Sequence, residues 1–110
     1  MMQKDKYLLE FIKIKSSKYS DTYICKGNSI PGSYILGNLF TTLSDREPHY
    51  LLEEIHLAMN NGQYGEYYSP DGAIHITIKI IPPNIEIDYF KIKLSEMKQL
   101  LHEWIYFVKS

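Results

Sequence analysis

Two histidines and one glutamate have the spacing that most resembles a chemical site. His49, Glu53 and His56 are four and three residues apart, so a helix would bring them to one face. Glu53 and His56 also form a Glu-x-x-His unit, which carboxylate-bridged di-metal bundles use as part of their ligand set. The sequence contains no second unit for a facing helix. Because the apolar residues of this segment supply its buried face, we expect the three polar side chains to face solvent and to hold no metal.

A pair of acids lies on a predicted strand. Glu86 and Asp88 are two residues apart and would share a face, as paired catalytic carboxylates do. If residues 81–84 form a four-residue loop, Lys79 lies opposite Glu86 and Thr77 lies opposite Asp88. This register predicts a cross-strand ion pair on a solvated face rather than an acid–base pair.

Other catalytic motifs are absent. The single cysteine, Cys25, cannot form an internal disulfide, and no thiolate-activating sequence surrounds it, so we interpret it as a partly buried structural residue. Gly62 and Gly65 are not followed by the Lys-Ser/Thr of a phosphate loop. Nor is there a nucleophile elbow, a His-Glu-x-x-His or a Cys-x-x-Cys motif. We therefore predict a protein that is not an enzyme and that binds no cofactor or metal.

Tyrosine is the residue type that stands out, with ten copies. Residues 63–72 place Tyr64, Tyr67 and Tyr68 among glycine, serine and acidic residues, a composition favoured at recognition surfaces. Two other interpretations stay open. The rings could stack on single-stranded bases, although the segment has no Lys or Arg to hold phosphates. They could also cover a sheet as part of an ordinary hairpin.

The elements that would position these residues follow from periodicity and turn signals. Residues 7–15 and 19–26 are typical of strands and would form a first hairpin, ending at a Gly27-Asn28 turn. Ser33 is placed to cap a short helix, in which Gly37 costs up to about 1 kcal/mol relative to alanine.

A second helix follows the first. Residues 44–47 have the spacing of a capping box, and Pro48 suits a first helical turn. The apolar stripe that comes next stops at residues 60–62, which read Asn-Asn-Gly.

The last third of the chain predicts two strands and a closing helix. Residues 73–81 alternate isoleucine with polar residues, residues 82–84 break the pattern, and residues 85–89 alternate again as a returning strand. Ser95 then caps a helix with one long apolar stripe. The stripe consists of Met97, Leu100, Leu101, Trp104, Ile105 and Val108.

Length and composition predict a single domain over residues 1–110, with 45% hydrophobic and 23% charged residues. No apolar run approaches the roughly 20 residues that span a bilayer, and no uninterrupted stretch resembles a secretory signal, so we expect a cytoplasmic protein. The order of elements predicts an α+β fold. Its antiparallel sheet of four to five strands would pack against two to three helices, including the C-terminal amphipathic helix.

The charges are unevenly distributed, although their sum is only −1. Residues 1–43 carry six lysines and three acids, which gives +3. Residues 44–91 carry eight acids and three basic residues, which gives −5. If the middle segment shares one surface, that surface would attract a cationic partner; the alternative is that these acids are scattered over a solvated shell.

Residues 73–110 resemble the small immunity proteins of bacterial polymorphic-toxin and contact-dependent growth-inhibition systems. The resemblance lies in the pair of Ile-rich strands broken by Pro-Pro-Asn at 82–84 and in the closing Ser-Glu-Met-Lys-Gln-Leu-Leu-His-Glu-Trp-Ile helix at 95–105. Over the whole chain, the resemblance is limited to the length and the α+β character. It implies an antitoxin that binds the C-terminal domain of a toxin, often a nuclease.

An acidic patch with aromatic anchors would suit a cationic nuclease toxin. The partner-binding residues predicted on this basis are Glu53, Glu54, Tyr64, Glu66, Tyr67, Tyr68 and Asp71. Two alternatives stay open: a homo-oligomeric interaction domain, and a small regulatory protein that binds nucleic acid without catalysis. The latter would need a continuous basic face, for which Lys13, Lys15, Lys18 and Lys26 are the candidates.

Overall fold

The fold was analysed in a computed structural model. It describes residues 2–16, 18, 21–28, 30, 32–43, 46–64, 67–68 and 76–109. The helices in this part of the chain are α1 (Gln3–Lys6), α2 (Ser33–Thr42), α3 (Glu47–Met59) and α4 (Leu94–Lys109). The strands are β1 (Glu10–Ile14), β2 (Thr22–Lys26), β3 (Tyr67–Tyr68), β4 (Ile78–Ile81), β5 (Asn84–Ile87) and β6 (Phe90–Lys93).

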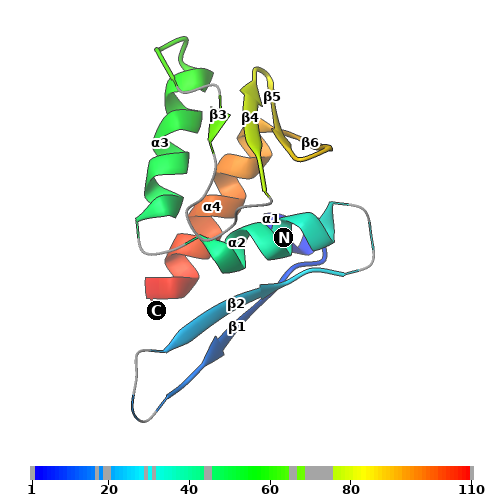
Figure 1. Cartoon of the computed structure of the whole chain (residues 1–110), viewed down its shortest axis with the longest axis vertical. Coiled ribbons are helices and arrows are strands. Elements are labelled where there is room, and N and C mark those ends of the chain that lie inside the picture. Colours follow the sequence, from blue (N-terminus) through cyan, green and yellow to red (C-terminus); the bar gives the residue numbers. More distant parts are fainter. Residues whose placement is uncertain are drawn as a thin grey trace.

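The α+β class is confirmed, but the prediction of a single sheet is wrong. β1 and β2 form a separate two-stranded antiparallel hairpin. β4, β5 and β6 form a second antiparallel sheet, which the two-residue β3 extends beside β4. α2 lies beside β2, on the edge where a further strand could pair, and the two sheets are separate (Figure 1). Four helices are present in the described residues, one more than predicted, and the extra one is α1.

The hairpin and α2 are held together by close backbone contact. A Cβ atom on Gly37 would lie 2.6 Å from the backbone nitrogen of Gly27 at the end of β2. The hydroxyl of Thr41 accepts a hydrogen bond from the Cys25 N–H (2.9 Å) and donates one to the Cys25 carbonyl (3.0 Å). Gly37 therefore lowers helix propensity at the one position where α2 must approach the strand most closely.

The N-terminal helix α1 is attached to α4 by carboxylates. Glu103 is buried and accepts hydrogen bonds from the backbone N–H groups of Gln3 (2.7 Å) and Lys4 (2.9 Å). Glu96, two turns earlier on α4, forms an ion pair with Lys6 and accepts a hydrogen bond from the Gln3 side chain. The sequence predicted a strand from residue 7, but α1 ends at Lys6, residues 7 and 8 form a turn, and β1 begins only at Glu10.

The start of α2 agrees with the prediction to within one residue, whereas the N-cap of α3 is Arg46, two residues after the predicted Ser44. Gly32, with φ of 92°, occupies the N-cap of α2 in place of the predicted Ser33, which is the first helical residue. Pro48 lies in the first turn of α3, as predicted. α3 ends as predicted, with Asn61 at φ 59° and the Gly62 N–H bonded to the carbonyl of Leu57 (2.8 Å). Residues 44–45 of the predicted capping box lie outside the described residues.

The second sheet has the predicted register at its centre. Lys79 pairs with Glu86, and the turn between β4 and β5 is Pro82-Pro83, joined by a cis peptide bond. The returning strand was predicted to run to Tyr89, but β5 ends at Ile87 and the Tyr89 side chain is 86% exposed. The chain turns at Asp88, where φ is 56°, and returns as β6, which sequence analysis missed.

The strand boundaries are shorter than predicted. β4 begins at Ile78 rather than at residue 73, and β2 begins at Thr22 rather than at residue 19. Residues 71–75, 19 and 20 lie outside the described part of the chain. α4 begins at Leu94, one residue before the predicted cap.

One hydrophobic core joins the two sheets through α4. Met97, Leu100 and Leu101 are fully buried, as the apolar stripe predicts. The Trp104 ring stacks on Phe40 of α2 at 5.8 Å and meets Phe11 of β1 edge-on at 5.1 Å. Trp104 is therefore the point at which the hairpin, α2 and α4 meet. Among the described helices, none is long and apolar enough to cross a membrane.

Candidate interaction surface

The outer face of α3 carries a row of exposed polar and aromatic side chains. Arg46, His49, Tyr50 and Glu53 are spaced so that they share one face of the helix. They line a shallow hollow of about 520 Å³. Leu51, Ile55 and Ala58 occupy the opposite, fully buried face. We name Arg46, His49, Tyr50 and Glu53 the α3 face.

Tyr50 and Glu53 give the α3 face its recognition chemistry. The Tyr50 ring is 55% exposed and offers a large rigid contact surface with a polar end. Glu53 is exposed within the same hollow. Within the α3 face the Glu53 carboxylate balances the Arg46 guanidinium, because the other two glutamates of residues 46–59 are buried (Glu47) and half-buried (Glu54). A ring beside a carboxylate suits the long apolar stem and cationic end of a lysine or arginine side chain.

The histidines of α3 lie where the sequence predicted them. His49, Glu53 and His56 are all exposed on the solvent side of the helix. The side-chain amide of Asn60 lies 3.4 Å from the His56 ring. No group of three or more His, Cys, Asp or Glu side chains is arranged to hold a metal among the described residues.

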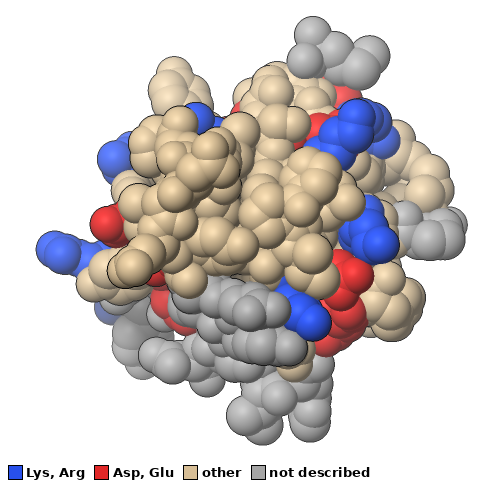
Figure 2. Space-filling view, turned by 90° about the horizontal axis from the view of Figure 1, so that it is seen from above, with Lys and Arg blue, Asp and Glu red and all other residues tan. Residues whose placement is uncertain are grey.

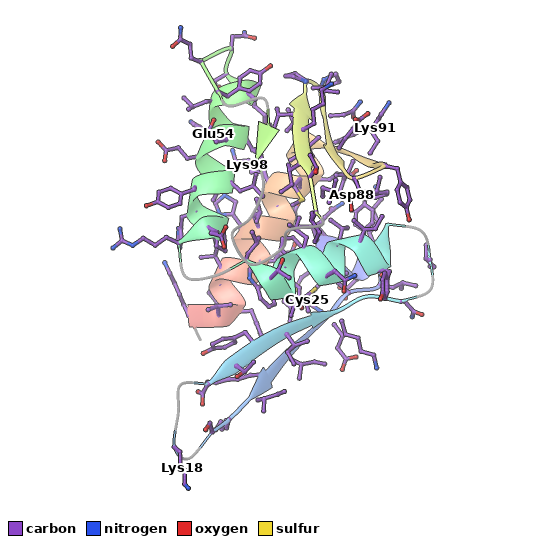
Figure 3. The ribbon with its side chains drawn as sticks, viewed as in Figure 1. Lys18, Cys25, Glu54, Asp88, Lys91 and Lys98 are labelled. Carbon is purple, nitrogen blue, oxygen red and sulfur yellow. The ribbon has the colours of Figure 1, made fainter. Side chains whose placement is uncertain are left out.

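Glu54 differs from its neighbour Glu53. Its side chain is half-buried and already takes part in an interaction, so it is not a free carboxylate of the outer surface. Figure 3 shows Glu54 on α3 and Lys98 on the adjacent α4. The structure therefore separates two acids that sequence analysis assigned to the same patch, because a one-residue step turns the side chain by about 100° around a helix.

The tyrosine-rich segment is only partly described. Tyr64 is half-buried and packs against the hydrophobic core, so it supports the fold. Tyr67 and Tyr68 form β3, paired with Lys79 and Ile78 of β4. Figure 1 shows β3 between α3 and β4. Glu66 and Asp71 lie outside the described residues.

A groove that the sequence did not predict lies at the end of the molecule where α3 stops. It has a volume of about 550 Å³ and is lined by the end of α3, the β4–β5 turn and the start of α4. Figure 2 looks onto this end and shows a broad area without charged side chains, with charged residues at its edges. The lining residues are Ala58, Met59, Asn61, Pro82, Pro83, Asn84, Lys93, Leu94 and Ser95. Sequence analysis treated the two prolines only as a strand break.

The other residues tested for chemistry have structural roles. Cys25 lies on β2 beside α2 (Figure 3). Burial raises the pKa of its thiol to about 12, so the thiol stays protonated. Glu86 lies 3.8 Å from the Lys91 ammonium as well as opposite Lys79. Asp88 accepts a hydrogen bond from the Thr77 N–H (3.0 Å), which holds the β5–β6 turn against the start of β4.

The chain was compared with known proteins at the level of sequence and of fold. No family model, no curated protein and no solved structure matches it.

Proposed function

We propose that this chain is an immunity protein that binds and neutralises a bacterial toxin domain. The α3 face is its primary contact. The observation that carries the proposal is the exposed Tyr50 beside Glu53, in a hollow on the outer side of α3. The sequence resemblance of residues 73–110 to immunity proteins supports a toxin domain as the partner.

The rigidity of α3 supports a binding role. Its apolar side is packed against α4, so the outer side chains are presented from a fixed backbone. A side chain that is already oriented loses little further conformational entropy on binding. The α3 face can therefore contribute more net affinity than the same residues on a mobile segment.

The exposed Glu53 carboxylate supports a partner that offers a cationic side chain. A toxin that cleaves nucleic acid must attract phosphates and tends to carry a positive surface. Glu53 would pair with a lysine or arginine of that surface, while Tyr50 would pack on its stem. Aromatic residues at such central positions commonly contribute at least about 2 kcal/mol, or roughly 30-fold in affinity.

The first experiment is co-purification with a tagged chain from its native host, followed by mass spectrometry. Support requires that the captured protein carries a domain that is toxic on its own and harmless when this chain is co-expressed at equal stoichiometry. A captured domain whose toxicity persists, or no stoichiometric partner, would contradict the proposal.

The second experiment locates the contact. Tyr50→Ala should weaken toxin binding by roughly 30-fold in calorimetry, because it removes the exposed ring at the centre of the α3 face. Tyr89→Ala is the matched control, since Tyr89 is exposed but lies on the β5–β6 turn. Unchanged affinity of the Tyr50 variant, with a loss in the Tyr89 variant, would move the contact away from α3.

A further inference from the structure

The β1–β2 hairpin has one covered edge and one open edge. The edge of β2 is covered by α2, whose Thr41 hydroxyl bonds to both backbone groups of Cys25. The outer edge of β1 pairs with no strand in the described part of the chain. In Figure 1, β1 runs along the outside of the hairpin, away from the second sheet. An open edge is a template for pairing with another strand.

The hairpin also has an apolar face that does not belong to the core. Phe11 and Tyr23 point toward α4, where both contact the Phe107 ring. Ile12 and Ile24 pair with each other on the opposite face of the hairpin, since side chains alternate along a strand. Both are only half-buried and lie outside the core cluster. Ile14, next along this face, is 49% exposed.

We propose that a second copy of this chain pairs with the open edge. The two β1 strands would run antiparallel about a two-fold axis at Ile12 and join the hairpins into one four-stranded sheet, in the order β2–β1–β1–β2. The inference is independent of the proposed toxin-binding function, because the α3 face lies on a different element.

The sequence of β1 is self-complementary in this register. Ile12 lies opposite Ile12 of the second copy, and Phe11 lies opposite Lys13, whose ammonium is already 3.5 Å from the Asp21 carboxylate. Glu10 lies opposite Ile14. A register centred on Lys13 would instead place two lysines directly opposite each other, which destabilises a strand pair. The charges of β1 therefore favour the register centred on Ile12.

The same register keeps the isoleucines of both copies on one side of the sheet. Residues that face each other across an antiparallel pair project from the same face. Ile12, Ile14 and Ile24 of the two copies would thus form one continuous apolar surface across the seam.

The mass in solution is the first test. Light scattering during gel filtration should give twice the 12.9 kDa chain mass at high concentration, and the monomer mass on dilution. A monomer at every concentration up to about 1 mM, the range of weak association, would overturn the proposal.

Two substitutions at one position test the register. Ile14→Glu places a carboxylate opposite Glu10 of the second copy and should raise the dimer dissociation constant at least about tenfold. Ile14→Lys places an ammonium there and should leave the dimer intact. Thr22→Glu is the matched control, because Thr22 is the partner of Ile14 within the hairpin but lies one strand away from the seam. Equal losses in both Ile14 variants, with an unchanged circular dichroism spectrum, would overturn this register.

A cross-link gives an independent measurement. In a Cys25→Ala background, Ile12→Cys should form a disulfide-linked dimer on oxidation, because directly opposed Cβ atoms lie about 4.5–5.5 Å apart. Ile24→Cys, one strand away on the same face, should stay monomeric on a non-reducing gel. Cross-linking of the Ile24 variant alone would show that the copies meet at a different edge.

Discussion

The two sheets of this protein differ in what covers their isoleucines. Ile78, Ile80, Ile85 and Ile87 of the second sheet are at most 2% exposed, whereas Ile12 and Ile24 of the hairpin are half-buried. Both sheets use the same residue type with the same alternation. The second sheet packs against α4, while the outer-face residues Ile12 and Ile24 of the hairpin lie outside the core cluster that the described residues form.

This difference shows that alternation determines a face but not its burial. A strand places every second side chain on one side, and a helix must then cover that side before water is excluded. α4 does so for the second sheet. For the hairpin, α2 covers one edge and the aromatic cluster covers the inner face, which leaves the outer face outside the core and the edge of β1 unpaired among the described strands.

The largest expected effect comes from the residue that joins the two regions. Trp104→Ala should destabilise the protein by about 3–5 kcal/mol, because it removes the ring that contacts both Phe11 and Phe40. Urea unfolding measures this loss. His102→Ala, on the exposed side of α4, should change stability by less than about 0.5 kcal/mol. A loss below about 1 kcal/mol at Trp104 would mean that the hairpin is attached by other contacts.

A matched pair of substitutions measures the difference between the sheets directly. Ile85→Val removes one methylene from a fully buried site and should cost about 0.5–1.5 kcal/mol. Ile12→Val removes the same group from a half-exposed site and should cost less, when measured at concentrations where the chain is monomeric. Equal costs in urea unfolding would show that the outer face of the hairpin is buried within the monomer.

A smaller effect is expected where α1 attaches to α4. The ion pair with Lys6 lowers the pKa of Glu96, opposed by desolvation and assisted by hydrogen bonds from Tyr7 and Gln3. A carboxylate with a lowered folded-state pKa stabilises the protein at neutral pH, and this contribution is lost as pH falls through the ordinary and then the lowered pKa. Glu96→Gln should therefore be less stable than the wild type at pH 7, with the difference shrinking below about pH 4.

Thermal unfolding of the wild type and the variant across this pH range gives the measurement. Glu53→Gln serves as the control, because Glu53 is exposed on the outer side of α3. A stability difference at Glu96 that is the same at pH 3 and pH 7 would show that its charge does not hold α1 in place.

Much of the fold could be predicted because its signals are local. The register of β4 and β5 was predicted from the spacing of Lys79 and Glu86 around a short turn, and the apolar stripe of α4 from its period. β6 was missed because the turn at Asp88 and Tyr89 carries no glycine, and the strand after it is only four residues long. The turn depends on a positive φ at Asp88 and on its hydrogen bond with Thr77, which is a contact between strands.

The candidate site was predicted only in part for a similar reason. Glu53 could be assigned to the solvent side of a helix from periodicity alone. Tyr50 was not predicted as a partner-binding residue, although it shares the face of Glu53, because a tyrosine on a helix is equally compatible with a core position. The separation of Glu54 from Glu53 depends on α4 lying beside α3.

The sequence by itself determined the α+β class, the periods of the main elements and the stop signals that bound α3. These properties arise from side chains a few residues apart, whose interactions do not depend on the rest of the chain. The tertiary structure alone decided that there are two sheets rather than one, that Gly37 meets Gly27, and which isoleucines are buried. Each of these outcomes requires segments distant in the sequence to compete for the same space, so the packing of the whole chain selects among arrangements that local pattern allows.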